Sequence, residues 1–303
     1  GLGKDTWSQY TEVNLLGGAK VYEVYGGGNN GKVLNTQSLA QWRHDEGSGL
    51  DISIPGYETG TVYTDKDGKE FQLDAGLESP LAHAVSLNGQ KYNTNVHIYK
   101  DATVVNYAYG GGLGTDAVVS GTTYIDLLGG TVTKDLYAAG TSGAVLDYYK
   151  AKEGQGGTFT ASSTAYIEGG TVRNVYGGGW AGDVGYHDKE TTATTTDILG
   201  ETYVVIGIRK DQVTLPDGYG YYKGVPAIQR NAYSGGEGGS VFGTAHLTMN
   251  NGYIGYTYNS KTGQYEEKLH DETWTDHVGK DRLSDCGNLF GGGYDDNSSV
   301  DFT

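Results

Sequence analysis

The chain has very little of three residue types that shape most folds: one Cys, one Met and four Pro among 303 residues. The lone Cys286 cannot form an internal disulfide, so packing and backbone pairing have to supply the stability. No apolar run approaches the ~18 residues of a membrane-spanning helix, and we therefore predict no membrane span.

Positive charge is scarce as well. The 21 Lys and Arg residues stand against 37 Asp and Glu, which gives a net charge of -16. A chain of this charge repels phosphate backbones, so we predict no nucleic-acid partner. The acidic residues are scattered, which favours general solubility over a dedicated acidic binding face.

Glycine and tyrosine are abundant, with 52 and 26 residues, and they occur together. An aromatic residue followed by three glycines recurs four times, and two looser copies lie between them. Such self-similarity indicates an array in which each unit buries its apolar face against its neighbours. The six motifs begin at Tyr25, Tyr109, Tyr137, Tyr176, Tyr233 and Phe290.

Each unit contains three short strand patterns. One strand ends at a Gly-Gly turn, as in residues 124–130; a second, residues 131–137, runs into the glycine corner; a third follows the corner and is marked by a valine. This pattern predicts an all-β right-handed parallel β-helix, or β-solenoid, of about six coils with three short strands per coil. The valine markers are Val33, Val118, Val145, Val184, Val241 and Val300.

A propeller or a set of hairpin meanders is the alternative for this periodicity. The spacing between successive corners is uneven, and a solenoid tolerates such variation because extra residues leave a corner as loops. We expect one domain over residues 1–303, with large loop insertions at residues 35–90, 210–228 and 257–285. The first contains a predicted hairpin at residues 61–73 with an Asp67-Gly68 turn. We expect the other two to leave from the same corner.

Units of the form strand, Gly-Gly, Thr-Val and Val-Tyr-Gly-Gly-Gly resemble the repeats of glycine-rich surface or secreted proteins of Bacteroidetes-type bacteria, which are adhesin-like right-handed β-helices. The best matches are residues 13–28, 124–140 and 165–179. The resemblance covers about half of the chain and excludes the insertions. It implies an extracellular or cell-surface location in a bacterium and a structural or adhesive role, and it carries over no catalytic residue.

The only candidate catalytic groups on the predicted strands are single charges. We interpret them as solvated outer-face charges and not as the acid and base of a polysaccharide-degrading enzyme, because no close pair is implied. We therefore predict no catalytic residue and a protein that is not an enzyme. The charges are Asp126, Lys134, Asp135, Glu168 and Arg173.

Two acidic segments have partial features of a calcium site. Asp65, Asp67 and Glu70 resemble the beginning of a calcium loop, but the rest of the pattern is missing and a plain hairpin turn is favoured. Asp295 and Asp296 are interpreted as a polar loop. The histidines form no convincing ligand pair, and we predict neither a metal nor a cofactor. They are His44, His83, His97, His187, His246, His270 and His277.

Aromatic side chains could contact sugars or partner proteins, although core and loop packing accounts for most of them. Trp180 differs, because it follows a glycine corner and is hard to bury inside a small solenoid. Tyrosines such as Tyr219, Tyr221 and Tyr258 occur in or beside the insertions.

The two ends of the sequence suggest self-assembly. A second-strand pattern at residues 10–18 and a third-strand pattern at residues 298–303 put the end of one copy in phase with the start of another, without a recognisable cap. We expect either a head-to-tail fibre or a segment of a longer surface protein. The predicted function is an extracellular structural protein, a subunit of a surface fibre or adhesin stalk, with itself and a host or polysaccharide surface as partners. The alternative is a carbohydrate-binding or polysaccharide-degrading β-helix, which requires a groove where carboxylates converge beside exposed aromatics.

Overall fold

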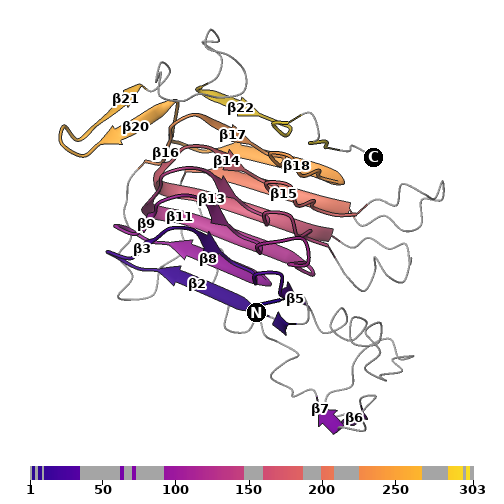
Figure 1. The fold of residues 1–303 in the computed structure, drawn as a ribbon. Helices are drawn as coiled ribbons and strands as arrows, with labels where there is room; N and C mark the ends of the chain where they lie inside the picture. Colours follow the sequence, from indigo (N-terminus) through magenta and orange to yellow (C-terminus); the bar gives the residue numbers. More distant parts are fainter. Residues whose placement is uncertain are drawn as a thin grey trace.

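The computed structural model describes residues 2–3, 6–8, 10–34, 62–64, 70–72, 92–146, 160–186, 199–207, 225–267, 286–295 and 298–300. The described residues are all-β and include no helix. Most strands pair in parallel with strands far away in the sequence, and they stack in ladders from β2 at the lower end to β18 and β22 at the upper end (Figure 1). The all-β prediction is confirmed, and the parallel ladders are compatible with a β-solenoid.

The long-strand ladder joins six strands in chain order, each parallel to the next. Its alternate side chains form aligned columns, and the column of Val96, Ile125, Ala165 and Val204 is fully buried. These aliphatic columns make up much of the hydrophobic core. The strands are β2 (Thr11–Leu15), β8 (Thr94–Ile98), β11 (Thr122–Val132), β13 (Thr160–Val172), β15 (Leu199–Ile206) and β18 (Gly243–Met249).

A second ladder of short strands covers the same core. It consists of β3 (Lys20–Val21), β9 (Thr103–Val104), the ends of β11 and β13, β16 (Ala227–Ile228) and β19 (Tyr253–Ile254). One residue of each member points inward, so that a second aliphatic column faces the first. The column is Val21, Val104, Val132, Val172, Ile228 and Ile254.

The third ladder, which we call the tyrosine ladder, carries the aromatic residue of each repeat. Residues before the aromatic, such as Leu136 and Val175, belong to the core, so by strand alternation the aromatic rings lie on the outer side. The strands are β4 (Val24–Tyr25), β10 (Ala108–Tyr109), β12 (Leu136–Tyr137), β14 (Val175–Tyr176), β17 (Asn231–Tyr233) and β22 (Asn288–Phe290).

The prediction of one continuous second strand at residues 131–137 is therefore wrong. Thr131 and Val132 belong to the second ladder, whereas Leu136 and Tyr137 belong to the tyrosine ladder. The chain bends between them at Asp135, whose side chain accepts hydrogen bonds from the equivalent bend of the next repeat. A buried polar side chain that bonds to backbone stabilises a bend in place of a continuous strand.

The predicted third strand is a ladder of single bridges, which we call the valine ladder. The sequence pattern predicts Val118 as the second of these residues, but the ladder residue is Val119. Val119 is buried in a small second core, whereas Val118 is half-buried. The short strand β1 (Trp7–Ser8) pairs with β5 (Lys32–Val33) and extends this ladder at the lower end. The bridged residues are Val33, Val119, Val145, Val184, Val241 and Val300.

Each repeat forms one level of the stack. The small distance between the backbones of neighbouring levels requires glycine at the third position of each corner. A Cβ on Gly140 would lie 2.7 Å from the carbonyl oxygen of Gly112, and one on Gly179 would lie 2.6 Å from that of Gly140. Parallel strands are spaced at about 4.8 Å, which leaves no room for a side chain there. Ala138 and Ala139 occupy the first two corner positions in one repeat, whereas a Cβ on Gly110, the first corner glycine of the preceding repeat, would clash with the Ala138 carbonyl oxygen.

Two antiparallel hairpins lie in the predicted insertions. Strands β6 (Val62–Thr64) and β7 (Glu70–Gln72) confirm the strand pairing of the first hairpin, while its turn lies outside the described residues. Strands β20 (Tyr256–Asn259) and β21 (Gln264–Glu267) form the second. The second insertion follows β15 and the third follows β19, so the prediction of a shared corner is wrong. Ala227 and Ile228, assigned to an insertion from the sequence, supply the apolar pair of β16.

Candidate functional site

The outer side of the tyrosine ladder forms a groove of about 890 Å³, which we call the tyrosine groove. Its floor is a column of stacked aromatic rings, with neighbouring ring centroids 4.8–5.0 Å apart and planes within 10° of parallel. Tyr137 is 1% exposed and Tyr233 is 4% exposed, so the rings lie beneath the residues on either side. The floor consists of Tyr25, Tyr109, Tyr137, Tyr176, Tyr233 and Phe290.

One side of the groove is built by the residue that follows the third glycine of each corner. Backbone hydrogen bonds hold this position in register: Trp180 N–H donates to Gly140 at 3.1 Å, and Glu237 N–H donates to Gly179 at 3.0 Å. The ladder thus fixes the backbone here and leaves the side chain free to vary. The side chains are Leu113, Thr141, Trp180, Glu237 and Tyr294. Trp180 is half exposed, as its position in the sequence suggested.

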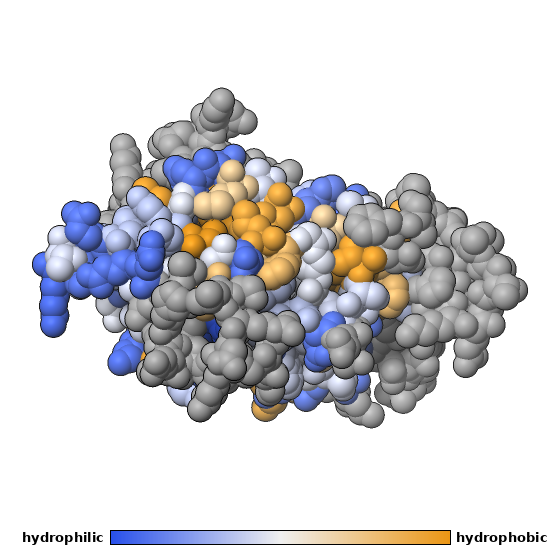
Figure 2. All heavy atoms as spheres, turned by 90° about the horizontal axis from the view of Figure 1, so that it is seen from above, coloured by the Kyte–Doolittle hydropathy of each residue, from blue (hydrophilic) through white to orange (hydrophobic). Residues whose placement is uncertain are grey.

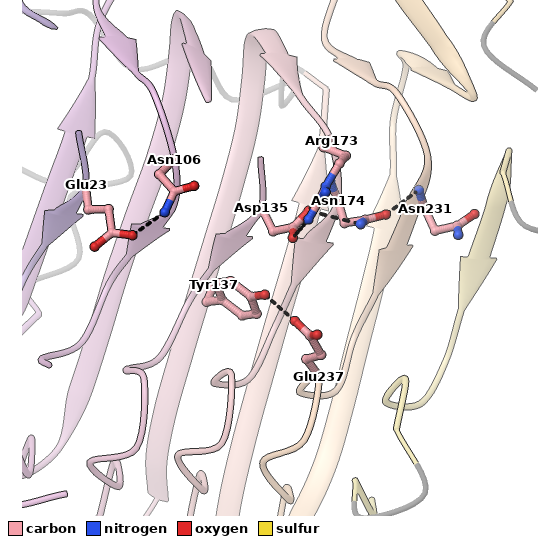
Figure 3. Close-up of polar contacts among 8 residues, drawn as sticks. All are labelled: Glu23, Asn106, Asp135, Tyr137, Arg173, Asn174, Asn231 and Glu237. Atoms are coloured by element: carbon pink, nitrogen blue, oxygen red, sulfur yellow. Dashed lines mark hydrogen bonds and ion pairs between the residues drawn. The ribbon is translucent and has the colours of Figure 1, made fainter. Parts of the chain in front are cut away.

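The other side is built by the bend before each tyrosine strand. Here a polar side chain of one level accepts a hydrogen bond from the backbone N–H of the next: Asn174 donates to Asp135 and Asn231 to Asn174, each at 3.1 Å (Figure 3). Asn288 donates to Asn231 in the same way at 3.1 Å. Glu23 accepts a hydrogen bond from Asn106 at the lower end. This polar ladder holds the charged residues of the groove in place.

Asp135 and Arg173 form an ion pair within this side (Figure 3). Arg173 donates from Nε at 2.8 Å and from Nη2, and Asn174 Nδ2 adds a bond at 3.0 Å. Burial lowers the pKa of Arg173, but the hydrogen bond and charge of Asp135 outweigh it and raise the pKa. Arg173 therefore stays charged.

The interpretation of the strand charges as single and solvated is thus wrong for four of them: Arg173 is paired with Asp135, and three carboxyl groups are buried. Asp135 is 3% exposed, Glu168 is 8% exposed and Asp126 is fully buried. Asp126 Oδ2 lies 2.9 Å from His97 Nδ1 on the long-strand ladder. A strand pattern indicates which way a side chain points, but not whether that face of the sheet is covered.

Glu237 reaches across the groove floor and accepts a hydrogen bond from the Tyr137 hydroxyl (Figure 3). Burial raises the pKa of Glu237 and the charges of Asp135 and Asp295 raise it further, while the Tyr137 hydrogen bond and Arg173 partly oppose them; the net pKa lies above 4.5. Burial is also the main cause that raises the pKa of Tyr137 well above 10. Tyr137 is therefore a neutral donor, and Glu237 is a carboxyl group with an unusually high proton affinity.

The candidate calcium residues Asp65, Asp67 and Asp296 lie outside the described residues, and only the backbone of Glu70 is described. The backbone N–H of Asp295 donates to the Glu237 carbonyl at 2.8 Å. Within the described part of the chain, no group of three or more His, Cys, Asp or Glu residues could hold a metal. Of the seven histidines, only His97 and His246 are described.

No described helix is long and apolar enough to cross a membrane. Comparison with family models, curated proteins and solved structures found no match to this chain.

Sequence reasoning missed the groove residues Glu23, Arg230 and Glu237. A signal for Glu237 was present: the residue after the third corner glycine differs in every repeat, while the glycine itself does not change. A position whose backbone is fixed and whose side chain varies is a good candidate for recognition.

Proposed function

We propose that the ladders are the faces of one right-handed β-solenoid of about six coils, and that the protein is an extracellular structural subunit of a bacterial surface fibre or adhesin stalk. The resemblance of its repeats to glycine-rich surface proteins supports the location. Parallel pairing that continues from β2 to β18 supports the mechanical role, because such a rod is stiff along its axis. The observation that carries the proposal is a patch of partly exposed apolar side chains at the upper end, next to a strand edge that no described strand extends.

Apolar side chains gather on the upper end, where Figure 2 shows an orange patch. Met249, Tyr253, Leu289 and Phe290 are 37–44% exposed. One level below, the equivalent Ile206, by contrast, is fully buried. No described strand pairs with the outer edge of β18. Exposed core next to an unpaired strand edge is a surface that favours the addition of another layer.

A second copy of this chain fits that surface. The columns of its lower end begin with Val13, Val21 and Tyr25. When two copies stack, these residues would cover Leu247, Ile254 and Phe290 of the other copy, respectively. Leu16 and Tyr22 of that end are also exposed, at 44% and 68%. Contacts between two different ends do not close on themselves, so stacking produces a fibre.

Stacking requires one local rearrangement. In this structure Trp7 and Ser8 pair with Lys32 and Val33, which is the place that Val300 of a preceding copy would take. One of the two segments must therefore move when copies stack. The segment at residues 6–8 acts as a removable cap of the lower end, and its deletion should accelerate assembly.

Electron microscopy and sedimentation of the full chain at rising concentration test this function. We expect filaments whose axial repeat is one subunit, and faster assembly after deletion of residues 1–9. The double variant Leu289→Glu and Phe290→Glu should remain monomeric, while Tyr258→Glu, on the hairpin and similarly exposed, should assemble normally; circular dichroism checks folding. Monodisperse rods at every concentration, or filaments unaffected by the double variant, would rule out head-to-tail assembly.

A further inference from the structure

The tyrosine groove has a repeating chemistry of which head-to-tail assembly uses only the two end rings, Tyr25 and Phe290. It is lined from Tyr25 to Phe290 and thus follows the stacked levels along most of the ladder. Equivalent positions recur with the 4.8–5.0 Å spacing of the stacked rings. An elongated groove with a regular repeat suits a linear polymer whose units are about as long as one level is high. A β-linked sugar chain has such a repeat.

The lining combines hydrogen-bonding groups with aromatic surface. Glu237 brings a half-buried carboxyl group, which the Tyr137 hydroxyl holds by a hydrogen bond, and Trp180 contributes a half-exposed indole. Binding sites for polar ligands are recognised by such a mixture of apolar surface and a few fixed polar groups. Sugars present hydroxyls at their edges and C–H groups on their faces, which match polar groups and an indole ring respectively.

The charges of the groove argue for a neutral ligand. Three carboxylates line it, those of Glu23, Asp135 and Glu237, against the guanidinium groups of Arg173 and Arg230. Arg173 is already paired with Asp135. The whole chain carries a net charge of -16, so a polyanion would approach against a repulsive field.

Two neighbouring groove residues have side chains that the backbone hydrogen bonds of the ladder do not require. Trp180 and Glu237 occupy equivalent positions on successive levels. On the two levels below, Leu113 and Thr141 occupy this position and make the same backbone hydrogen bond. The backbone of this column makes the ladder hydrogen bonds whichever side chain is present. A half-exposed indole and a half-buried carboxyl group at these positions therefore need another explanation, and ligand contact supplies one.

We propose that the tyrosine groove binds a neutral linear oligosaccharide, with Trp180 stacking on a sugar ring and Glu237, held by Tyr137, hydrogen-bonding to sugar hydroxyls. The proposed sugar contacts, Trp180 and Glu237, are not among the exposed apolar residues of the upper end, although Phe290 belongs to both surfaces. Binding would let a surface fibre attach to a polysaccharide along its side.

Isothermal titration calorimetry on the full chain tests the groove. The probes are hexasaccharides of β-linked glucose, mannose and xylose, with an oligogalacturonate as the charged comparison. We expect at least one neutral probe to bind and the oligogalacturonate to bind more weakly. Failure of all three neutral probes, or preference for oligogalacturonate, would overturn the proposal.

Variants then locate the site. Trp180→Ala and Glu237→Gln should each weaken binding about tenfold, the size expected for loss of one good contact. The matched controls are Tyr258→Ala and Glu266→Gln on the β20–β21 hairpin, which should leave the affinity unchanged. Unaltered binding in both groove variants would place the sugar elsewhere and refute this site. Circular dichroism and thermal unfolding of each variant separate loss of binding from loss of fold.

Discussion

Tyr137 in β12 donates a hydrogen bond to Glu237, 100 residues further along the chain. The bond crosses the floor of the groove and joins side chains from two different columns of the repeat. It brings a carboxyl group into a site where burial raises its pKa. This pair lies at the centre of the proposed sugar-binding surface and also affects stability.

Replacement of Glu237 by Gln should make the protein more stable at neutral pH relative to the parent. Because the pKa of Glu237 is raised on folding, its contribution to stability is complete below about pH 4.5 and is lost as the pH rises through the folded pKa. Gln cannot ionise, so the variant does not lose this stability as the pH rises. Urea unfolding between about pH 4 and pH 8 measures the difference. A difference that does not grow with pH would show that ionised Glu237 is not penalised.

Asp135→Ala should destabilise the protein by about 3 kcal/mol, the lower part of the range for breaking a buried ion pair. The loss leaves Arg173 without its carboxylate and removes the acceptor for Asn174. Arg173 is 24% exposed and can partly reach water, which limits the cost. Asp135→Asn keeps an oxygen acceptor and should cost less. Equal losses in the two variants would contradict a role for the charge.

Particular residues show how much of this fold could be predicted from the sequence. The glycine corners, the tyrosine column and five of six ladder valines could be predicted from the sequence. Stacking places equivalent residues on top of one another, so the same residue types recur in each repeat. The bend at Asp135 was missed because residues 131–137 alternate like one strand. Its cause is a hydrogen bond to the next level, which no local pattern contains.

The groove itself could not be predicted for the same reason. Glu237 and Tyr137 are 100 residues apart, and only the register of the ladder brings them together. Asp126 was interpreted as solvated, yet it is fully buried beside His97. Sequence periodicity thus predicts columns along the ladder well, but not contacts between columns.

Gly140→Ala should destabilise the protein by roughly 1–3 kcal/mol, the usual cost of forcing extra volume into packed structure. Its Cβ would lie 2.7 Å from the Gly112 carbonyl oxygen, and neither backbone can move without disturbing the ladder. Gly292→Ala is the matched control, because a Cβ there meets nothing within 4 Å. Thermal unfolding of both variants provides the measurement. Similar melting temperatures for the two would mean that the levels are not held at fixed spacing.

The buried pair of His97 and Asp126 should make stability fall as the pH rises above 6.5. Burial alone lowers the pKa of His97, but the charge and hydrogen bond of Asp126, with the charge of Glu12, raise it above 6.5. A raised pKa gives a contribution that is complete below 6.5 and is lost as the pH passes the folded value.

In the variant Asp126→Asn we expect the change of stability with pH to have the opposite sign. Without the carboxylate, burial dominates and lowers the pKa of His97, so in this variant the stability should rise with pH as His97 loses its proton. Urea unfolding between about pH 5 and pH 9 compares the slopes of the parent, Asp126→Asn and the control His246→Gln on β18. The same slope in Asp126→Asn and the parent would show that His97 is neutral in the folded protein, and that the 2.9 Å contact is an ordinary hydrogen bond without an ionic component.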